Sequence, residues 1–210
     1  MRFLSPSMSC ILAVSVWFCV LSAIGAEPPM WTFDDKDAEK ELKSWGALNQ
    51  LAPLEIEEVK DNKGEKRMVL KTKSLGGDPY MFPGGDWNTA NYEPIDGTKY
   101  NILYMGIRVN LPNTWQVYYY SKQEPAWNEN QRQNYEVKSV DDFEDIEVEI
   151  TRGGWDKRDG IRFRIDPGTA QGVEAEIDYI SFTGPPNPVE SVQPEGNIAV
   201  TWGNLKNNNY

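Results

Sequence analysis

Residues 155–184, WDKRDGIRFRIDPGTAQGVEAEIDYISFTG, contain two strand-like runs joined by a turn. In residues 161–166 the apolar side chains occupy every second position, and Arg162 and Arg164 stand between them. Because successive side chains of a β-strand point to opposite faces, this alternation predicts a strand with one buried face. Pro167 has no backbone N–H to donate and Gly168 relaxes the chain, so the strand must end there.

The second run, residues 173–182, begins with alternation and then becomes apolar at consecutive positions. A strand with this pattern is covered on one face at its start and on both faces at its end. The two runs together predict a β-sheet protein.

The rest of the chain predicts more short strands and little helix. Residues 35–43 predict one or two helical turns, with Asp34 or Asp35 as the cap. Residues 74–97 and 124–134 are rich in turn-forming or polar residues and are predicted as loops. The further strand-like runs are residues 30–34, 54–59, 67–72, 100–109, 115–121 and 143–151. Many short strands at fairly even spacing predict an all-β, two-sheet antiparallel β-sandwich.

Several motifs resemble those of galactose-binding-like jelly rolls. Trp155, residues 161–167 and residues 177–180 resemble the C-terminal half of such domains, and residues 77–80 with Asp96-Gly97 match the upstream part. Domains of this kind are common as non-catalytic carbohydrate-binding modules of secreted bacterial proteins. The resemblance therefore implies a jelly-roll fold and a polysaccharide or other glycan as the partner.

The first 26 residues predict a cleaved signal peptide. Arg2 supplies a positive start, residues 11–21 form an apolar run, and residues 23–26 offer small side chains for cleavage. A membrane anchor is the alternative, but the apolar run is shorter than the ~20 residues that a spanning helix needs. We expect a secreted, periplasmic or cell-surface protein with no membrane insertion after cleavage.

The predicted mature chain divides into three parts. Residues 27–184 form the sandwich, residues 185–196 a Pro-rich linker, and residues 197–210 a short C-terminal appendage. The appendage contains the apolar run 198–202. It is predicted either to fold back as a strand or to dock on a protein partner.

Composition excludes several kinds of chemistry. The chain has no histidine, and both cysteines, Cys10 and Cys19, lie in the signal. The mature chain therefore has no disulfide, no Ser-His-Asp triad, no Cys-His pair and no histidine-ligated metal. Loss of Arg2 with the signal takes the formal charge from −11 to −12, which argues against nucleic acid and anionic membranes as partners. We expect no enzyme activity; carboxylate catalysis on a polysaccharide is the less favoured alternative.

Residues 115–120, WQVYYY, are the most suggestive stretch for sugar binding. Alternation places Trp115, Val117 and Tyr119 on one face, which is the natural core face, and the intervening residues on the other. Flat aromatic rings can stack on a pyranose while polar groups hold its hydroxyls. The predicted carbohydrate-binding residues are Gln116, Tyr118, Tyr120, Trp127 and Arg162. The alternative is that these tyrosines only cover sheet and loop contacts.

The two arginines of the first run point away from its apolar face. Arg164 is predicted to pair with Glu176 or Asp178, and a bidentate grip on an acidic sugar is the alternative. Similar jelly rolls often hold a structural calcium between the N-terminal segment and the final strand. The resemblance implies Asp34 or Asp35 and Asp178 as its ligands; calcium takes six to eight oxygens.

The sequence thus predicts non-catalytic binding of an extracellular carbohydrate by an aromatic and polar surface. A second hypothesis is a cell-surface or matrix module that contacts a protein, with the appendage around Val200 and Trp202 as the docking element.

Overall fold

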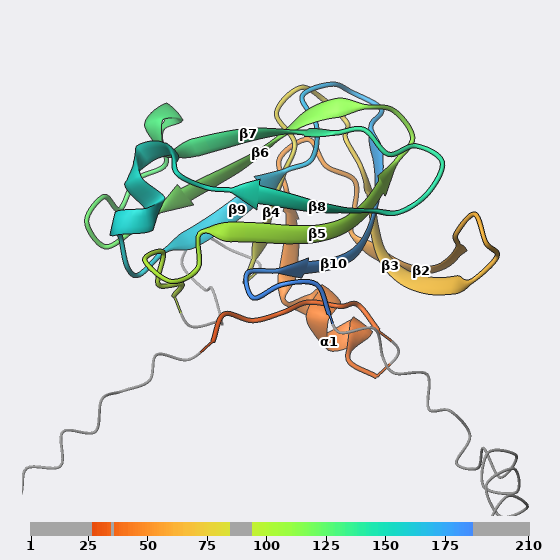
Figure 1. Ribbon diagram of the computed structural model, residues 1–210. Coiled ribbons are helices and arrows are strands. Elements are labelled where there is room, and N and C mark those ends of the chain that lie inside the picture. The colour runs from red at the N-terminus through yellow and green to blue at the C-terminus, as the bar shows by residue number, and fades with distance from the viewer. Residues whose placement is uncertain (1–26, 35, 85–93, 187–210) are drawn as a thin grey trace, which may run out of the picture.

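The computed structural model describes residues 27–34, 36–84 and 94–186. The predicted signal peptide, most of the linker and the C-terminal appendage lie outside the described residues. Within them, two five-stranded antiparallel sheets stack as a β-sandwich (Figure 1), which confirms the predicted fold class. We call the layer ordered β1-β4-β9-β6-β7 sheet 1 and the layer ordered β2-β3-β10-β5-β8 sheet 2.

The strands of sheet 1 are β1 (Trp45–Leu48), β4 (Tyr80–Pro83), β6 (Asn113–Tyr120), β7 (Arg132–Val137) and β9 (Arg162–Asp166). Those of sheet 2 are β2 (Glu55–Lys60), β3 (Lys66–Lys73), β5 (Ile102–Val109), β8 (Glu144–Glu149) and β10 (Glu174–Ser181). The helical elements of the described chain are α1 (Ala38–Lys43) and the 3-10 turns η1 (Glu129–Gln131) and η2 (Arg152–Lys157).

The core lies between the sheets and is filled by alternate side chains. Trp115, Val117 and Tyr119 of β6 are fully buried, as the period of two predicts. A chain of aromatic contacts, with centroids 4.9–6.2 Å apart, runs along this layer through Trp31, Trp45, Phe163, Phe182, Trp155 and Tyr119. Aromatic pairs in edge-to-face geometry add about 0.5–1.5 kcal/mol each beyond area burial.

Three sequence predictions about the elements of sheet 1 and the N-terminal segment were wrong. The loop predicted over residues 74–97 contains β4, and the loop predicted over residues 124–134 contains η1 and the start of β7. Strand β4 has only four residues and lies among glycine, proline and aspartate, which are typical of loops. Strand β7 is an edge strand of mostly polar residues, so it shows no apolar alternation. The strand predicted over residues 30–34 is a single bridge between Trp31 and Ile180.

The predicted cap of the first helix was also wrong. The N-cap of α1 is Asp37, and its side chain makes no capping hydrogen bond. Asp34 contributes through its backbone carbonyl, which accepts from the N–H groups of Asp37 and Ala38 at 3.1 and 2.8 Å. Asp35 lies outside the described residues.

A register shift in sheet 2 requires a glycine. Strand β10 shifts against β5 between Ile177 and Tyr179, which brings Tyr179 opposite Gly106. The Tyr179 hydroxyl donates to Asp145 Oδ1 at 2.9 Å, so its ring crosses the sheet surface over Gly106. A Cβ atom at position 106 would lie 2.7 Å from the Tyr179 ring.

We therefore predict that Gly106→Ala lowers the free energy of unfolding by about 1–3 kcal/mol, because the ring of Tyr179 must move and lose its bond to Asp145. Urea denaturation followed by tryptophan fluorescence measures the change. Gly77→Ala is the matched control, because a Cβ there meets only the Thr169 carbonyl at an ordinary 3.8 Å. Equal unfolding midpoints for the two variants would contradict the prediction.

Candidate functional site

The outer face of sheet 1 carries the residues that the sequence singled out. Strand β6 pairs with β9 on one side and with β7 on the other, so Tyr118 lies opposite both Arg164 and Arg132. Gln116, Tyr118 and Tyr120 point away from the core, as predicted. Tyr118 is only 7% exposed, however, whereas Gln116 and Tyr120 are half-buried. Tyr118 therefore belongs to the floor of this face rather than to its rim.

Aromatic rings and guanidinium groups alternate across this face in an aromatic–arginine row made of Tyr80, Arg164, Tyr118 and Arg132. The Arg164 Cζ lies 4.3 Å from the Tyr80 ring centroid and 4.2 Å from that of Tyr118. The Arg132 Cζ lies 5.7 Å from the Tyr118 centroid. Cation–π contacts shielded from water contribute up to about 2 kcal/mol each. The row therefore fixes the guanidinium groups across strands β4, β9, β6 and β7.

Tyr118 is also held at its hydroxyl. The Tyr118 O–H donates to Glu129 Oε1 at 2.8 Å, and Arg132 Nη1 donates to the Tyr118 hydroxyl at 3.1 Å. Arg132 in turn pairs with Glu129. Burial raises the pKa of Tyr118, so this hydroxyl stays protonated and keeps its role as a donor.

The ion pair predicted for Arg164 was wrong. Arg164 Nη2 bonds Asp166 Oδ2 at 2.8 Å, two residues along the same strand. Glu176 pairs instead with Arg108, and Asp178 with Arg67, each at 2.6 Å. The physical reason is topological: Arg164 lies on the outer face of sheet 1, whereas both predicted partners belong to β10 in sheet 2.

Asp166 is a buried carboxylate with one oxygen left over. The residue is 3% exposed, and its Oδ1 has no hydrogen-bond partner among the described residues. Burial raises the pKa of Asp166 to about 7; Arg164 opposes the rise and the carboxylate of Asp78 adds to it. A neutral carboxyl is thus favoured in the folded state at pH values where the unfolded chain is already ionised.

This shift predicts a pH dependence of stability. The pKa of Asp166 in the folded state lies above the unfolded value of about 3.8. The stability that this shift contributes is therefore fully present below pH 3.8 and is lost as the pH rises through about 7. Between pH 4 and pH 8, we expect the free energy of unfolding to fall less in Asp166→Asn than in the wild type. The difference should be a few kcal/mol, on the order of 1.4 kcal/mol per pKa unit.

Thermal and urea unfolding of the variant across this pH range provide the measurement. Asp159→Asn is the control, because Asp159 is exposed and its bonds to Gln123 and Lys122 hold its pKa below the usual value. A wild-type slope retained in Asp166→Asn would show that Asp166 does not titrate in this range.

Trp127 joins the outer face from the segment between β6 and η1. Its ring lies edge-on to Tyr120, with centroids 4.9 Å apart at 88°, and 5.7 Å from the ring of Phe82. The Arg164 Cζ lies 5.8 Å from the Trp127 centroid. The structure thus brings Trp127 to Tyr120, as the sequence predicted.

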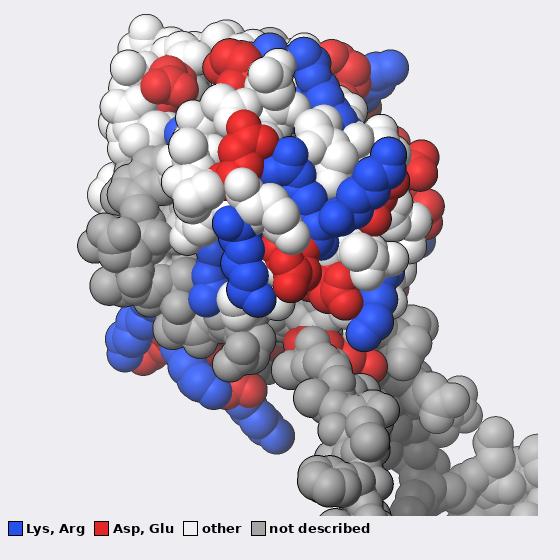
Figure 2. All heavy atoms as spheres, turned by 90° about the vertical axis from the view of Figure 1, so that its left-hand side faces the viewer, with Lys and Arg blue, Asp and Glu red and all other residues white. Residues whose placement is uncertain are grey.

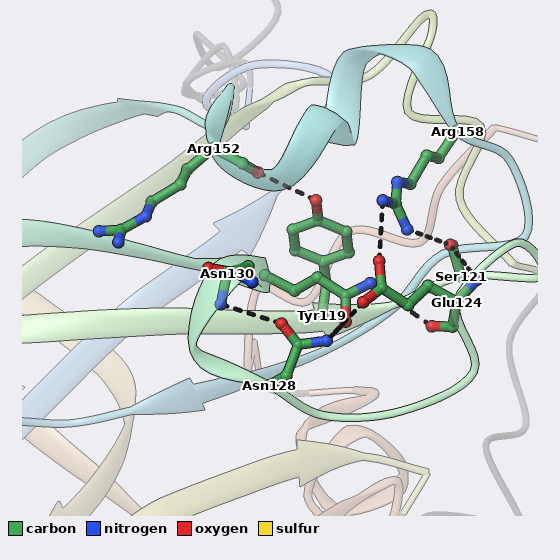
Figure 3. A network of polar contacts seen from close by, with 8 residues as sticks. Tyr119, Ser121, Glu124, Asn128, Asn130, Arg152 and Arg158 are labelled. Carbon is green, nitrogen blue, oxygen red and sulfur yellow. Dashed lines mark hydrogen bonds and ion pairs between the residues drawn. The ribbon is translucent and has the colours of Figure 1, made fainter.

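A network of polar contacts holds the segment that carries Trp127 (Figure 3). Arg158 bonds Glu124 Oε2 at 2.9 Å and donates to the Ser121 hydroxyl at 3.2 Å. Asn128 Nδ2 donates to Glu124 Oε1 at 2.8 Å, and the Asn130 N–H donates to Asn128 Oδ1 at 2.9 Å. The segment is therefore tied on both sides of Trp127 by side chains that no periodic pattern reveals.

A separate hydrogen bond, from Tyr119, ties η2 to the core. The Tyr119 hydroxyl donates to the Arg152 carbonyl at 2.9 Å, which joins η2 to the end of β6 (Figure 3). Gly153 follows with φ of 70°, and a Cβ there would lie 2.5 Å from that hydroxyl. Glycine is thus needed for η2 to close over this end of the sandwich.

The other predicted sugar-binding residues lie on the same face. Gln116 Nε2 donates to Asn134 Oδ1 at 3.3 Å, which gives an exposed pair of amides across β6 and β7. Arg162 is half-buried and stands opposite Tyr120 in the register of β9 with β6. The sequence missed Tyr80, Arg132 and Asp166 as parts of this face. The first two fell in predicted loops, and only the sheet order brings all three to one surface.

A separate hollow lies between the lead-in to α1, the β2–β3 hairpin and β10. It has a volume of about 820 Å³ and includes Asp34 and Asp178, which were predicted as calcium ligands. Its lining residues are Thr32, Asp34, Lys36, Asp37, Glu58, Lys66, Arg67, Met68 and Asp178. No aromatic ring is among these lining residues, so the hollow lacks the flat stacking surface that the sequence predicted for sugar binding.

The residues of this hollow do not fit a calcium ion as they stand. Asp178 Oδ2 accepts from Arg67 Nη1 at 2.6 Å, and Arg67 also lies 3.6 Å from Asp61. The described residues contain no group of three or more acidic, histidine or cysteine side chains that could hold a metal. Because Asp35 lies outside the described residues, calcium binding stays a prediction.

Comparison with solved structures supports the fold. Part of an exo-beta-agarase matches with a TM-score of 0.52 at 10% identity, over 79% of this chain and 26% of that chain. An arabinose-bound α-L-arabinofuranosidase matches with a TM-score of 0.48 at 10% identity, over 73% and 26%. The family 11 carbohydrate-binding module from Clostridium thermocellum, in complex with a β-1,3-1,4-mixed-linked tetrasaccharide, matches with a TM-score of 0.43 at 14% identity, over 73% and 94%.

The chain thus spans about a quarter of the length of the agarase and of the arabinofuranosidase. No protein-family model and no curated protein sequence matches it. The two stacked sheets and the match to part of the exo-beta-agarase confirm the predicted β-sandwich fold. Within the described residues, no helix is long and apolar enough to span a membrane.

Proposed function

We propose that this protein binds an extracellular carbohydrate, without catalysis, through the outer face of sheet 1. The observation that carries the proposal is the meeting of Tyr120 and Trp127 with the amide pair Gln116 and Asn134 on one surface. Binding sites for small ligands combine apolar or aromatic area with a few placed polar groups. Aromatic rings here offer flat area to a pyranose, and the amides offer both donors and acceptors to its hydroxyls.

The supporting geometry is rigid. Tyr118 is fixed by Glu129 and Arg132, and the segment of Trp127 is fixed by Glu124 and Arg158. A surface held in this way loses little conformational freedom when a ligand binds, which favours affinity. Secretion after cleavage of residues 1–26 is part of the proposal, and the C-terminal appendage as a protein-docking element stays a prediction, because both segments lie outside the described residues.

We propose that the protein is not catalytic because the carboxylates near the outer face of sheet 1 already have structural partners. Asp166 is engaged by Arg164, and Glu129 is engaged by Tyr118 and Arg132. A glycoside hydrolase needs one carboxyl group to protonate the leaving oxygen and a second to attack or to activate water. Asp166 has a raised pKa but is only 3% exposed, so it is poorly placed to reach a glycosidic oxygen, and Glu129 is held by Tyr118 and Arg132.

We predict that Trp127→Ala and Tyr120→Ala each weaken binding to a retained polysaccharide at least about tenfold, which corresponds to about 1.4 kcal/mol, because each removes aromatic contact area. Affinity electrophoresis of the mature domain through gels that contain plant, algal or bacterial polysaccharides measures the effect. Tyr104→Ala is the matched control, since Tyr104 is a half-buried tyrosine of β5 in sheet 2.

Thermal unfolding of all three variants separates lost binding from lost folding. The proposal fails when the wild-type domain is retained by none of the polysaccharides, or when Tyr104→Ala weakens retention as much as Trp127→Ala does.

A further inference from the structure

We propose that residues 198–202 of this chain, IAVTW, add as a further strand to the open edge of β1 and cover an apolar hollow beside it. The proposal concerns a surface of the sandwich away from the outer face of sheet 1, and it is independent of sugar binding.

The hollow lies where the chain passes from sheet 1 to sheet 2. It has a volume of about 390 Å³, and the described residues that line it are Leu42, Trp45, Leu51, Pro53 and Leu54. Leu42 belongs to α1 and Trp45 to β1, while Leu54 directly precedes β2. Because β1 and β2 are edge strands of their sheets, this β1 hollow lies on the side of the sandwich where both sheets end. Sites that accept small molecules measure about 300–1,000 Å³, so the β1 hollow has room for large apolar side chains.

Strand β1 differs from the other edge strands in its lack of charge. Sheets in natural proteins keep other chains away from their edges by placing charges on them or by covering them. The sequence of β1 is WGAL and contains no charged residue. The other three edge strands carry charged side chains, namely Glu55, Glu57, Glu58 and Lys60 on β2, Arg132 and Glu136 on β7, and Glu144, Asp145, Glu147 and Glu149 on β8.

The backbone of β1 has one side open to a further strand. Within the described residues β1 pairs with β4 alone, so one row of its N–H and C=O groups has no strand beside it. An extended segment can add to such an edge through main-chain hydrogen bonds, while its alternate side chains enter neighbouring pockets. The β1 hollow is a pocket of this kind.

The sequence of residues 198–202 suits this position. Ile198, Val200 and Trp202 alternate with Ala199 and Thr201, so in a strand the three large apolar side chains share one face. β-Branched and aromatic residues are also the ones that strands favour. One face of the added strand would thus fill the β1 hollow, and Thr201 would lie on the other face.

The last strand of the sandwich ends within reach of the β1 hollow. Ile180, near the end of β10, forms a bridge to Trp31, and the ring centroids of Trp31 and Trp45 are 5.1 Å apart. The eleven residues 187–197 lie between the described chain and the apolar run, and they span about 36 Å when extended. Neighbouring strands are about 4.8 Å apart, so a five-stranded sheet is only about 19 Å wide.

Another side of the molecule is a poorer receptor for an apolar strand. Figure 2 shows the side that lies at the left of Figure 1, where Lys and Arg side chains are interspersed with Asp and Glu. Covering such a surface with apolar side chains removes charges from water, which costs free energy. The β1 hollow has no charged side chain among its described lining residues and carries no such cost.

Disulfide trapping tests the proposal. Both native cysteines, Cys10 and Cys19, precede the predicted cleavage site, so two introduced cysteines are the only ones in residues 27–210. One chain carries Pro53→Cys, at an exposed position of the β1 hollow, together with Val200→Cys. The control chain carries Glu147→Cys with Val200→Cys, because Glu147 is exposed on β8, at the opposite edge of sheet 2 from β2.

Mild oxidation followed by non-reducing electrophoresis and peptide mass spectrometry measures the rate of disulfide formation within one chain. We expect the pair with Pro53→Cys to react at least about tenfold faster than the control pair, because docking raises the effective concentration of one cysteine beside the other. Equal rates for the two pairs, or no reaction of either, overturn the proposal. Disulfides formed mainly between two chains also overturn it, and they indicate a second copy as the occupant.

Hydrogen exchange tests the contact without introduced cysteines. Val200→Asp would place a charge in the β1 hollow, so we expect the open-edge N–H groups of β1 to exchange at least about tenfold faster than in the wild type. Thr201→Asp is the matched control, because its side chain would lie on the other face of the added strand, and we expect exchange close to that of the wild type.

Thermal unfolding of both variants reports whether the sandwich itself is kept. Exchange in β1 that is equal in Val200→Asp and Thr201→Asp contradicts the proposal. Docking of residues 198–202 on a different protein would give this result, since β1 would then be uncovered in the isolated chain.

Discussion

The pairing of β6 with β9 determines which side chains enter the core and which meet on the outside. With Val117 opposite Ile165 and Tyr119 opposite Phe163, the inner face closes as a continuous apolar layer. The same register places Tyr118 beside Arg164 on the other side of the sheet. A slip of β9 by one residue against β6 would turn Arg162 and Arg164 toward the core and expose Phe163 and Ile165. Core packing and the outer face therefore depend on one alignment.

Two tyrosine rings help to stabilise the buried ion pair of Arg164 and Asp166 on the outer face of sheet 1. The side chains of Arg164 and Asp166 are 10% and 4% exposed, and removing two charges from water costs several kcal/mol for each ion in real proteins. Tyr80 and Tyr118 stack on the guanidinium and offset part of that cost. Asp166 offsets another part by favouring its neutral form. The outer layer is consequently a polar assembly in which the positions of Arg164, Tyr118 and Arg132 depend on one another.

Sequence patterns predicted those features that are local in the chain. Alternation in β6 and β9 assigned Trp115 and Tyr119 to the core and Tyr118 to the outside, because a period of two is a property of each strand alone. The partner of Arg164 was predicted wrongly, because pairing across the molecule depends on sheet membership. Strand β4 escaped prediction for a different reason: four residues are too few to show a period, and the sheet order places them beside β9.

The residues of the candidate site also differ in whether they could be predicted from the sequence. The residues that a strand pattern presents together, Gln116, Tyr118 and Tyr120, were predicted as one surface. Tyr80 and Arg132 reach that surface only through neighbouring strands, and Glu124 and Arg158 act on Trp127 through bonds between segments that are 34 residues apart. Calcium ligation was implied by the family resemblance alone. That resemblance could not predict that Asp178 bonds Arg67.

The edge strand β8 of sheet 2 affects how readily two copies of the protein can associate. Strand β8 ends this sheet, and Glu144, Asp145, Glu147 and Glu149 are exposed along it. An uncovered strand offers unpaired N–H and C=O groups to any other chain, which is how sheets of separate molecules join and aggregate. Four carboxylates on six residues make such a union repulsive, since a second copy would bring the same charges to the same line. The charges of β8 therefore oppose edge-to-edge pairing of two copies of this domain.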